Sequence, residues 1–239
     1  YDFIFNNIIM APSKTQFWTY RVMCVLGEKF NLGPEFCITK IPFNIINTEM
    51  AGQFTLQMNS SFMIGIVLGF PYLLFEIWRF VKPALLEKER KSATGFTIYA
   101  SMLFMIGILF EYYIIAPLSI SFLTNYQVSE IIQNLITIDS YFSTVATLTI
   151  GSGIIFELPI IIYILSKLGI MTPKFMRSYR RYATVIILII AAIVTPTPDL
   201  ISMLTVSFPL FLLYELSILV SARVERGKKK EELNFYGGA

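Results

Sequence analysis

Four carboxylates lie in or beside long apolar runs, where a charged group is unfavourable unless a specific contact stabilises it. Glu157 is the deepest, because no other charged residue occurs between Asp139 and Lys167. A charge at the centre of a bilayer costs about 2.5–3.5 kcal/mol on insertion scales, so such residues face a protein interior or a wet cavity. Glu157 is therefore predicted to be a polar contact for a substrate or a partner helix. The alternative is a protonated Glu hydrogen-bonded inside the bundle.

The other three carboxylates give weaker functional signals. Glu76 lies one turn before the end of its apolar run, and Glu111 is followed by two tyrosines, so both can reach the interface or a neighbouring Tyr. Glu215 lies well inside the last apolar run, where a functional contact and a helix anchor are equally open. No basic residue is expected at membrane depth. The sequence therefore suggests no internal ion pair, and leaves hydroxyls, backbone, water or another protein as partners.

A second group of charges lies in the segment VKPALLEKERKS, residues 81–92. Glu87 and Glu89 stand there among basic residues that include Arg90. An exposed carboxylate can accept a guanidinium in a bidentate geometry, which makes this loop a candidate arginine-binding site. A solvated basic loop is the simpler interpretation, and spacing alone favours it.

Several kinds of chemistry have no candidate residues in this sequence. The chain has no histidine and only two cysteines, so no metal-ligand cluster is expected. It also lacks a Ser/His/Asp set, a Walker-type loop and a dinucleotide fingerprint. Gly151 and Gly153 lie inside an apolar run, where they are typical of helix packing through small residues. The sequence therefore predicts a protein that is not an enzyme, with no metal, cofactor or nucleic-acid partner.

These residues are carried by a chain with the composition of an integral membrane protein. It is 55% hydrophobic and 15% charged, whereas soluble domains carry roughly 25% charged residues. Its mean hydropathy is +0.65. A length of 239 residues leaves no room for a second large domain. The predicted fold is all-α, a polytopic helix bundle within a lipid bilayer.

Five apolar runs are long enough, or nearly so, to span the bilayer as helices. They cover about residues 55–80, 94–123, 140–166, 182–195 and 201–221. About 13 apolar residues of the fourth run rise only roughly 20 Å, so this helix is expected to thin the bilayer or to be shielded by partners. Residues 1–52 are predicted to form a compact cap with one short helix, and 1–223 a single membrane domain. The charged tail, 224–239, is predicted to be disordered.

Loop charges predict the orientation of these spans. Fifteen of the 19 basic residues fall in three clusters of five, at 79–91, at 167–181 and, at the start of the tail, at 223–230, whereas 124–138 and 195–200 have none. The positive-inside rule then makes the three clusters cytoplasmic and the cap periplasmic. This places Tyr1 outside, which predicts a sixth span upstream of it and two cytoplasmic termini. A cleaved signal peptide is the alternative.

The two cysteines, Cys24 and Cys37, fall on the predicted outer side, where oxidation is possible. A disulfide between them and two buried free thiols are both open.

Three motifs in these loops and spans resemble one family. They are FPYLLFEIWRFVKPALLEKERK, FELPIIIYILSKLGIMTPKFMRSYRRY and TPTPDLISML…PLFLLYELSILV, in this order, within about residues 46–223. The chain is similar to TatC, the multispanning receptor of the twin-arginine protein translocase, which has six spans and two cytoplasmic ends. The resemblance implies a cytoplasmic-membrane receptor for signal peptides with paired arginines. It would work with TatA/TatB-type single-span partners in a homo-oligomeric complex, exporting folded proteins with the proton-motive force.

The resemblance also implies roles for individual residues. By similarity, Glu89 matches the loop carboxylate that contacts the arginine pair and Phe80 a nearby aromatic, with Glu87 and Arg90 beside them. Glu157, in FELP, matches an in-membrane Glu that lines a concave face. Glu76 is, like Glu157, a candidate polar contact within the membrane.

A partner-docking region is implied around the outer turn. Thr195 lies at the position of a polar docking site, and Asp199 matches the aspartate of a TPPD-type turn. Met203 stands where relatives can carry Gln. Glu215, in the last span, is the fourth candidate residue for partner docking.

The chain departs from the family pattern in several places. A cytoplasmic N-terminal segment with a Glu-Leu-Arg signature and a second arginine-binding Glu does not occur in this sequence. Relatives can carry Gln in place of Glu76 and a small residue in place of Glu111, so the roles of these two carboxylates stay open.

A second function class is a proton-coupled small-solute transporter with Glu157 and Glu111 as proton relays. No inverted repeat and no matched pair of broken helices support it. An intramembrane enzyme is disfavoured because no nucleophile–base pair occurs.

Overall fold

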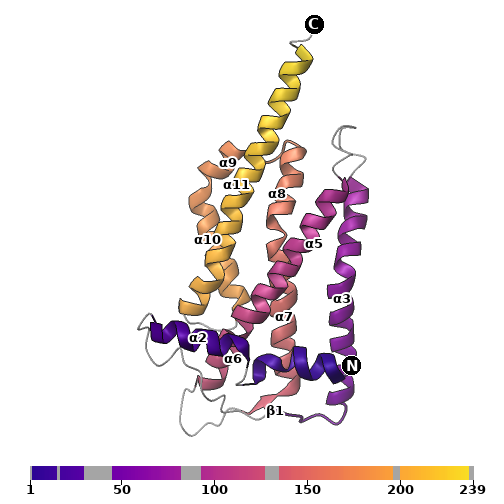
Figure 1. Cartoon of the computed structure of the whole chain (residues 1–239), viewed down its shortest axis with the longest axis vertical. Helices are drawn as coiled ribbons and strands as arrows, with labels where there is room; N and C mark the ends of the chain where they lie inside the picture. The colour runs from indigo at the N-terminus through magenta and orange to yellow at the C-terminus, as the bar shows by residue number, and fades with distance from the viewer. Residues whose placement is uncertain are drawn as a thin grey trace. The chain divides into compact units, whose positions relative to one another are not determined.

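The computed structural model describes residues 2–14, 17–29, 45–81, 93–126, 135–195 and 200–236. These residues are almost wholly helical, as the all-α prediction requires (Figure 1). The one strand pair among them joins β1 (Ile45–Ile46) to β2 (Ile136–Thr137) in parallel, with Ile45 opposite Ile136.

Four apolar helical stretches in the described part of the chain are long enough to cross a membrane. They are Gly52–Phe80, Thr97–Thr124, Ile138–Lys167 and Met203–Gly227. The helices that carry them are α3 (Gly52–Val81), α5 (Ala93–Phe110) with α6 (Ala116–Asn125), α7 (Ile138–Phe156) with α8 (Leu158–Lys167), and α11 (Leu200–Tyr236). The fifth predicted span corresponds to α10 (Arg180–Val194), which has only 15 residues. The sequence anticipated that this helix would be short.

The chain forms two compact units, and several helices contribute to both. The first unit comprises Tyr1–Val67, Ile108–Ser152 and Val194–Ser202. The second comprises Leu68–Gly107, Gly153–Ile193 and Met203–Ala239.

The N-terminal segment of the first unit is built from short helical pieces. They are α1 (Asp2–Ile4), the π-helical turn η1 (Phe5–Ile9), the 3₁₀ turn η2 (Ala11–Ser13) and α2 (Trp18–Lys29). Two tyrosines of the apolar helices hold this segment, because Tyr112 Oη donates to Ile8 O and Tyr141 Oη donates to Ile9 O, both at 2.9 Å. Tyr20 Oη donates to Pro12 O at 2.7 Å, and burial raises the pKa of this hydroxyl. The predicted cap is therefore a packed region with more helix than the single short one expected.

A π-helical turn, η5 (Glu111–Ile115), interrupts the second apolar stretch. Pro117 follows it and has no N–H to donate to the preceding turn, and the N–H of Ala116 instead reaches five residues back to Glu111 O. Such single π turns often occur at functional sites. Here the turn sets the faces on which Glu111 and Tyr112 project.

In the second unit, α8 and α11 approach closely through small side chains. Ser166 Oγ donates to Ser221 Oγ at 2.8 Å, and both residues are buried. Ile162, Met176 and Ile218 form a buried apolar cluster beside this contact. Small residues allow membrane helices to approach one another, and hydroxyls can then bond across the interface.

Local signals explain the sharp connection after α8. Gly169 has φ of +79°, the left-handed conformation in which glycine ends a helix without strain. Thr172 then caps α9 (Pro173–Ser178), since its Oγ1 accepts the N–H of Phe175 at 3.2 Å. Pro173 occupies the first helical position, where its missing N–H is not needed.

The C-terminal tail differs from its prediction where the structure describes it. The sequence predicted disorder from residue 224, whereas α11 continues as a helix to Tyr236 (yellow in Figure 1). Lys, Arg and Glu are good helix formers, and adding residues to an existing helix avoids the cost of nucleation. A charged composition therefore does not by itself exclude a helix there.

Candidate functional site

Glu157 lies at the break between α7 and α8. Its N–H donates to Ile154 O at 3.1 Å, three residues back rather than four, and Pro159 two positions later has no N–H. Its side chain is 5% exposed, and neither carboxylate oxygen has a hydrogen-bond partner among the described residues. A buried carboxyl without a partner is unfavourable, so this position is suited to accept a donor from another molecule.

Glu111, in the first unit, is fully buried at the start of η5. Thr149 Oγ1 of α7 donates to Glu111 Oε2 at 2.7 Å and is itself bonded to Val145 O at 2.8 Å. Oε1 of Glu111 has no partner in the described part of the chain. A hydroxyl was one of the partner types that the sequence left open, and Thr149 is that partner.

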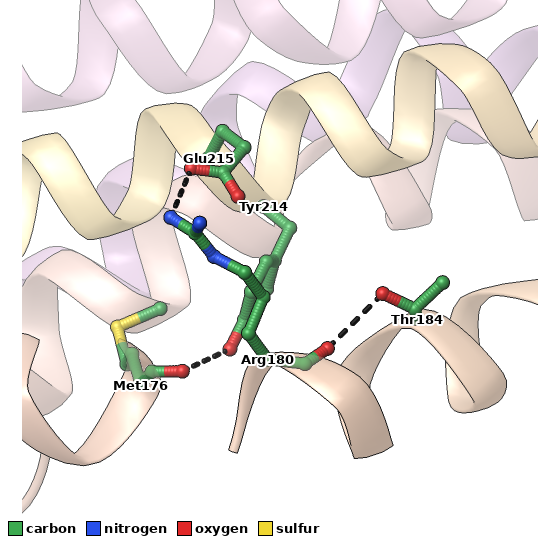
Figure 2. Close-up of polar contacts among 5 residues, drawn as sticks. All are labelled: Met176, Arg180, Thr184, Tyr214 and Glu215. Atoms are coloured by element: carbon green, nitrogen blue, oxygen red, sulfur yellow. Dashed lines mark hydrogen bonds and ion pairs between the residues drawn. The ribbon is translucent and has the colours of Figure 1, made fainter. Parts of the chain in front are cut away.

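Glu215 forms an ion pair that the sequence did not suggest. Arg180 Nη2, at the start of α10, donates to Glu215 Oε2 at 2.8 Å, as Figure 2 shows. The side chains are 49% and 35% exposed. The expectation that no basic residue reaches an in-span carboxylate was therefore wrong. Arg180 was assigned to the loop, but a long guanidinium side chain can extend along an apolar surface to a carboxylate.

A second bond fixes the same region. Tyr214 Oη of α11 donates to Met176 O of α9 at 2.8 Å (Figure 2). Two neighbouring residues of α11, Tyr214 and Glu215, thus hold α9 and the first turn of α10.

Glu76 and Phe80 occupy the last turns of α3. Glu76 Oε1 lies 3.6 Å from Arg79 Nη1, with side chains 41% and 72% exposed, respectively. An exposed pair of this kind contributes at most about 1 kcal/mol. Phe80 is 85% exposed. This end of α3 therefore presents an aromatic ring and a weakly held carboxylate.

The remaining candidate residues are only partly described. Thr195, which follows α10, is 5% exposed, and Met203 lies partly buried near the start of α11. Cys24 of α2 takes part in a disulfide. Glu87, Glu89, Arg90, Asp199 and Cys37 lie outside the described residues.

No three His, Cys, Asp or Glu side chains come together as a metal site within the described ranges. The residues that sequence reasoning missed are Arg180, Thr149 and Tyr214. Each was visible only as a polar residue in or beside an apolar run, and its partner lies at least 35 residues away. The arrangement offers carboxylate acceptors in apolar surroundings, which suits recognition of donor groups.

Comparisons with known proteins agree on one family. The family model for TatC, the Sec-independent protein translocase protein, matches residues 1–209. The chain is 36% identical over 226 residues to TatC of Blattabacterium sp. subsp. Periplaneta americana, covering 94% of this chain and 85% of that protein. It is 40% identical to TatCy of Bacillus subtilis over 173 residues, covering 72% of this chain and 68% of that protein. A crystal structure of the twin-arginine translocase receptor TatC matches with TM-score 0.63 and 30% identity, covering 91% of this chain and 94% of that one.

Proposed function

This chain belongs to the TatC family of Sec-independent protein translocase proteins, and we propose that it is the receptor subunit of a twin-arginine translocase. It is a multi-pass membrane protein and a translocase component rather than an enzyme. We propose that it binds signal peptides with paired arginines and, with its partners, exports folded proteins by means of the proton-motive force. The family match supports this function over a proton-coupled solute transporter.

The observation that carries the proposal is the state of Glu157. It is a buried carboxylate at a helix break, and its two oxygens lack hydrogen-bond partners among the described residues. A receptor that binds a peptide inside the membrane needs such an acceptor, because a peptide donor gains most where water cannot compete. Glu157 therefore contacts the signal peptide or a partner helix, with Glu76 as a second polar contact.

The arginine pair is proposed to bind at the loop that follows α3. Glu89 accepts the guanidinium groups, with Glu87 and Arg90 in the same loop. Phe80, whose ring is exposed at the end of α3, supplies an aromatic face beside them. Arginine suits this role because its planar fork matches a carboxylate and its face stacks on aromatic rings.

Single-span partners of the TatA/TatB type are proposed to dock around α10 and the start of α11. The proposed docking residues are Thr195, Asp199, Met203 and Glu215. The short α10 favours this placement, because a helix of 15 residues rises only about 22 Å and leaves bilayer thickness for a partner to cover. We propose that several copies of the chain assemble in one translocase.

The proposed location is the cytoplasmic membrane. The basic segments at 79–91, at 167–181 and in the tail face the cytoplasm, and α2 with its disulfide-bonded Cys24 faces the outside. The oxidised cysteine supports this orientation, since disulfides persist in oxidising compartments.

The proposal is tested by site-specific crosslinking of a photoreactive twin-arginine signal peptide to the protein in native membranes. Glu157→Ala should reduce crosslinks from the hydrophobic part of the peptide by about tenfold or more, the effect of losing one hydrogen bond to a charged group. Glu89→Lys should remove crosslinks from the arginine pair. Glu111→Gln is the matched control, because it changes another buried carboxylate whose partner, Thr149, lies within this chain.

Each outcome separates the alternatives. Undiminished crosslinking and transport in Glu157→Ala would make this residue structural. Equal transport loss in Glu157→Ala and Glu111→Gln, with crosslinking intact in both, would instead favour proton relays. Membrane insertion, measured by protease protection, must remain normal in every variant.

A further inference from the structure

The segment that joins α8 to α10 carries a basic stripe with no acidic neighbour in sequence. No Asp or Glu occurs between Lys167 and Val194. Lys174, Arg177 and Arg181 are all exposed. They are spaced three and four residues apart, so they lie on one side of a helix. Helical spacing continues from α9 into α10, because Tyr179 N–H donates to Phe175 O at 3.1 Å and Ala183 N–H to Tyr179 O at 3.0 Å.

A different side of this segment is held against α11, which fixes the direction of the stripe. Figure 2 shows the two bonds that hold it, Arg180 to Glu215 and Tyr214 to the carbonyl of Met176, each at 2.8 Å. The first bond neutralises Arg180. Arg177 and Arg181 have no ion-pair partner among the described residues. Their charge is therefore available to a ligand on a preorganised surface.

An aromatic ladder occupies a neighbouring side of the same segment, about a quarter turn around the helix from Lys174 and Arg181. The ring centroids of Phe175 and Tyr179 are 4.5 Å apart, and those of Tyr179 and Tyr182 are 5.8 Å apart. All three side chains are about half exposed or more. The same helix face continues along α10 with exposed Ile186, Ile189 and Ile193. Aromatic rings that lead from cations to aliphatic side chains are typical of the border between lipid headgroups and acyl chains.

We propose that this surface binds an anionic phospholipid, with its phosphate on Arg177 and Arg181 and an acyl chain along the aromatic ladder and the isoleucines of α10. Guanidinium groups bind phosphate oxygens in a bidentate geometry, and Lys174 adds a third cation. An acidic peptide would use the cations and leave the apolar face uncovered. A phospholipid matches both halves of the surface in the order in which they follow one another along the helix.

The test measures lipid binding to the purified full chain in dodecyl maltoside by native mass spectrometry. Dioleoylphosphatidylglycerol is titrated against zwitterionic dioleoylphosphatidylcholine, and the anionic lipid should bind more tightly. The double variant R177Q/R181Q should weaken that binding about thirtyfold, because each cation near a membrane surface contributes about a factor of five. The control R223Q/R226Q removes the same charge from exposed positions of α11. It should weaken the binding much less than R177Q/R181Q does.

Several results would overturn the proposal. They are equal affinity for the two lipids, unchanged affinity in R177Q/R181Q, or an equal loss in the control pair. Displacement of the lipid by inorganic phosphate at similar concentration would indicate a free-anion site. Retained lipid binding in R177Q/R181Q with loss of a co-purifying single-span protein would indicate a protein-docking surface. Should the double variant not fold, R177Q and R181Q alone test the same idea, each with about a fivefold loss.

Discussion

Gly153 is the position where a single methyl group should disturb the helix packing that supports Glu157. A Cβ placed on Gly153 of α7 would lie 2.5, 2.9 and 3.1 Å from three ring carbons of Phe104 of α5. Phe104 is 1% exposed and stacks on Phe70 of α3, with ring centroids 3.6 Å apart, so its ring has little room to move. Overpacking of this kind costs about 1–3 kcal/mol. Gly153→Ala should therefore destabilise the protein despite the better helix propensity of alanine.

Gly151 provides a matched control two residues earlier in the same helix. Apart from its two chain neighbours and the nearby backbone of its own helix, no atom of the described residues lies within 4 Å of a Cβ placed there. Both exchanges gain about 1 kcal/mol of helix propensity. The difference in stability between the two alanine variants thus isolates the clash with Phe104. For a chain of this size each kcal/mol shifts Tm by about 2–4 °C, so Gly153→Ala should unfold about 2–12 °C below Gly151→Ala.

The assay is thermal unfolding of the two variants in the same detergent, with size-exclusion chromatography used to monitor the folded fraction. Adding Phe104→Leu to Gly153→Ala should recover part of the loss, because a smaller side chain makes room for the methyl group. Glu157 lies about one turn after Gly153, at the end of the same helix. Signal-peptide crosslinking through Glu157 should therefore fall with Gly153→Ala and return with the double variant. Equal Tm values for the two alanine variants would refute the reasoning.

Two further exchanges test the polar contacts of the helices. Arg180→Gln and Glu215→Gln should each lower Tm by about 2–4 °C, since a half-exposed ion pair contributes about 1 kcal/mol. The double variant should lower Tm no more than either single variant does. Additive losses of Tm in this double-mutant cycle would show that the two side chains are not coupled. Thr149→Val keeps the shape of the side chain and removes the hydroxyl that Glu111 accepts. It should destabilise the protein by about 1–3 kcal/mol in the same assay, and Glu111→Leu in that background should recover stability.

The parts of the fold that follow from local chemistry could be predicted from the sequence. Apolar length identified the four long spans and the shortness of α10. The break at Glu157 is also a local effect, because Pro159 removes a backbone donor from the helix. Pro117 accompanies the π turn at Glu111 in the same way, although its geometry was not predicted. Such signals place a residue on an element without identifying its partner.

Partners depend on which helix faces meet, and this is where the prediction from sequence failed. Arg180 and Glu215 are 35 residues apart, and the charge pattern assigned them to a loop and to a span. The pairing arises because α9 turns back against α11, held by Tyr214 and the carbonyl of Met176. Hydropathy averages over a window and contains no information about that turn.

Three carboxylates in the apolar stretches now differ in a way that bears on function. Glu111 and Glu215 each accept a bond from another helix of this chain. Glu157 is nearly as buried as Glu111, yet neither of its oxygens is bonded within the described residues. An unsatisfied buried acceptor costs about 1–3 kcal/mol, and a donor arriving on a bound peptide would remove that cost. The instability of the free state would then become affinity in the bound state, which is what our proposal that Glu157 contacts the signal peptide requires.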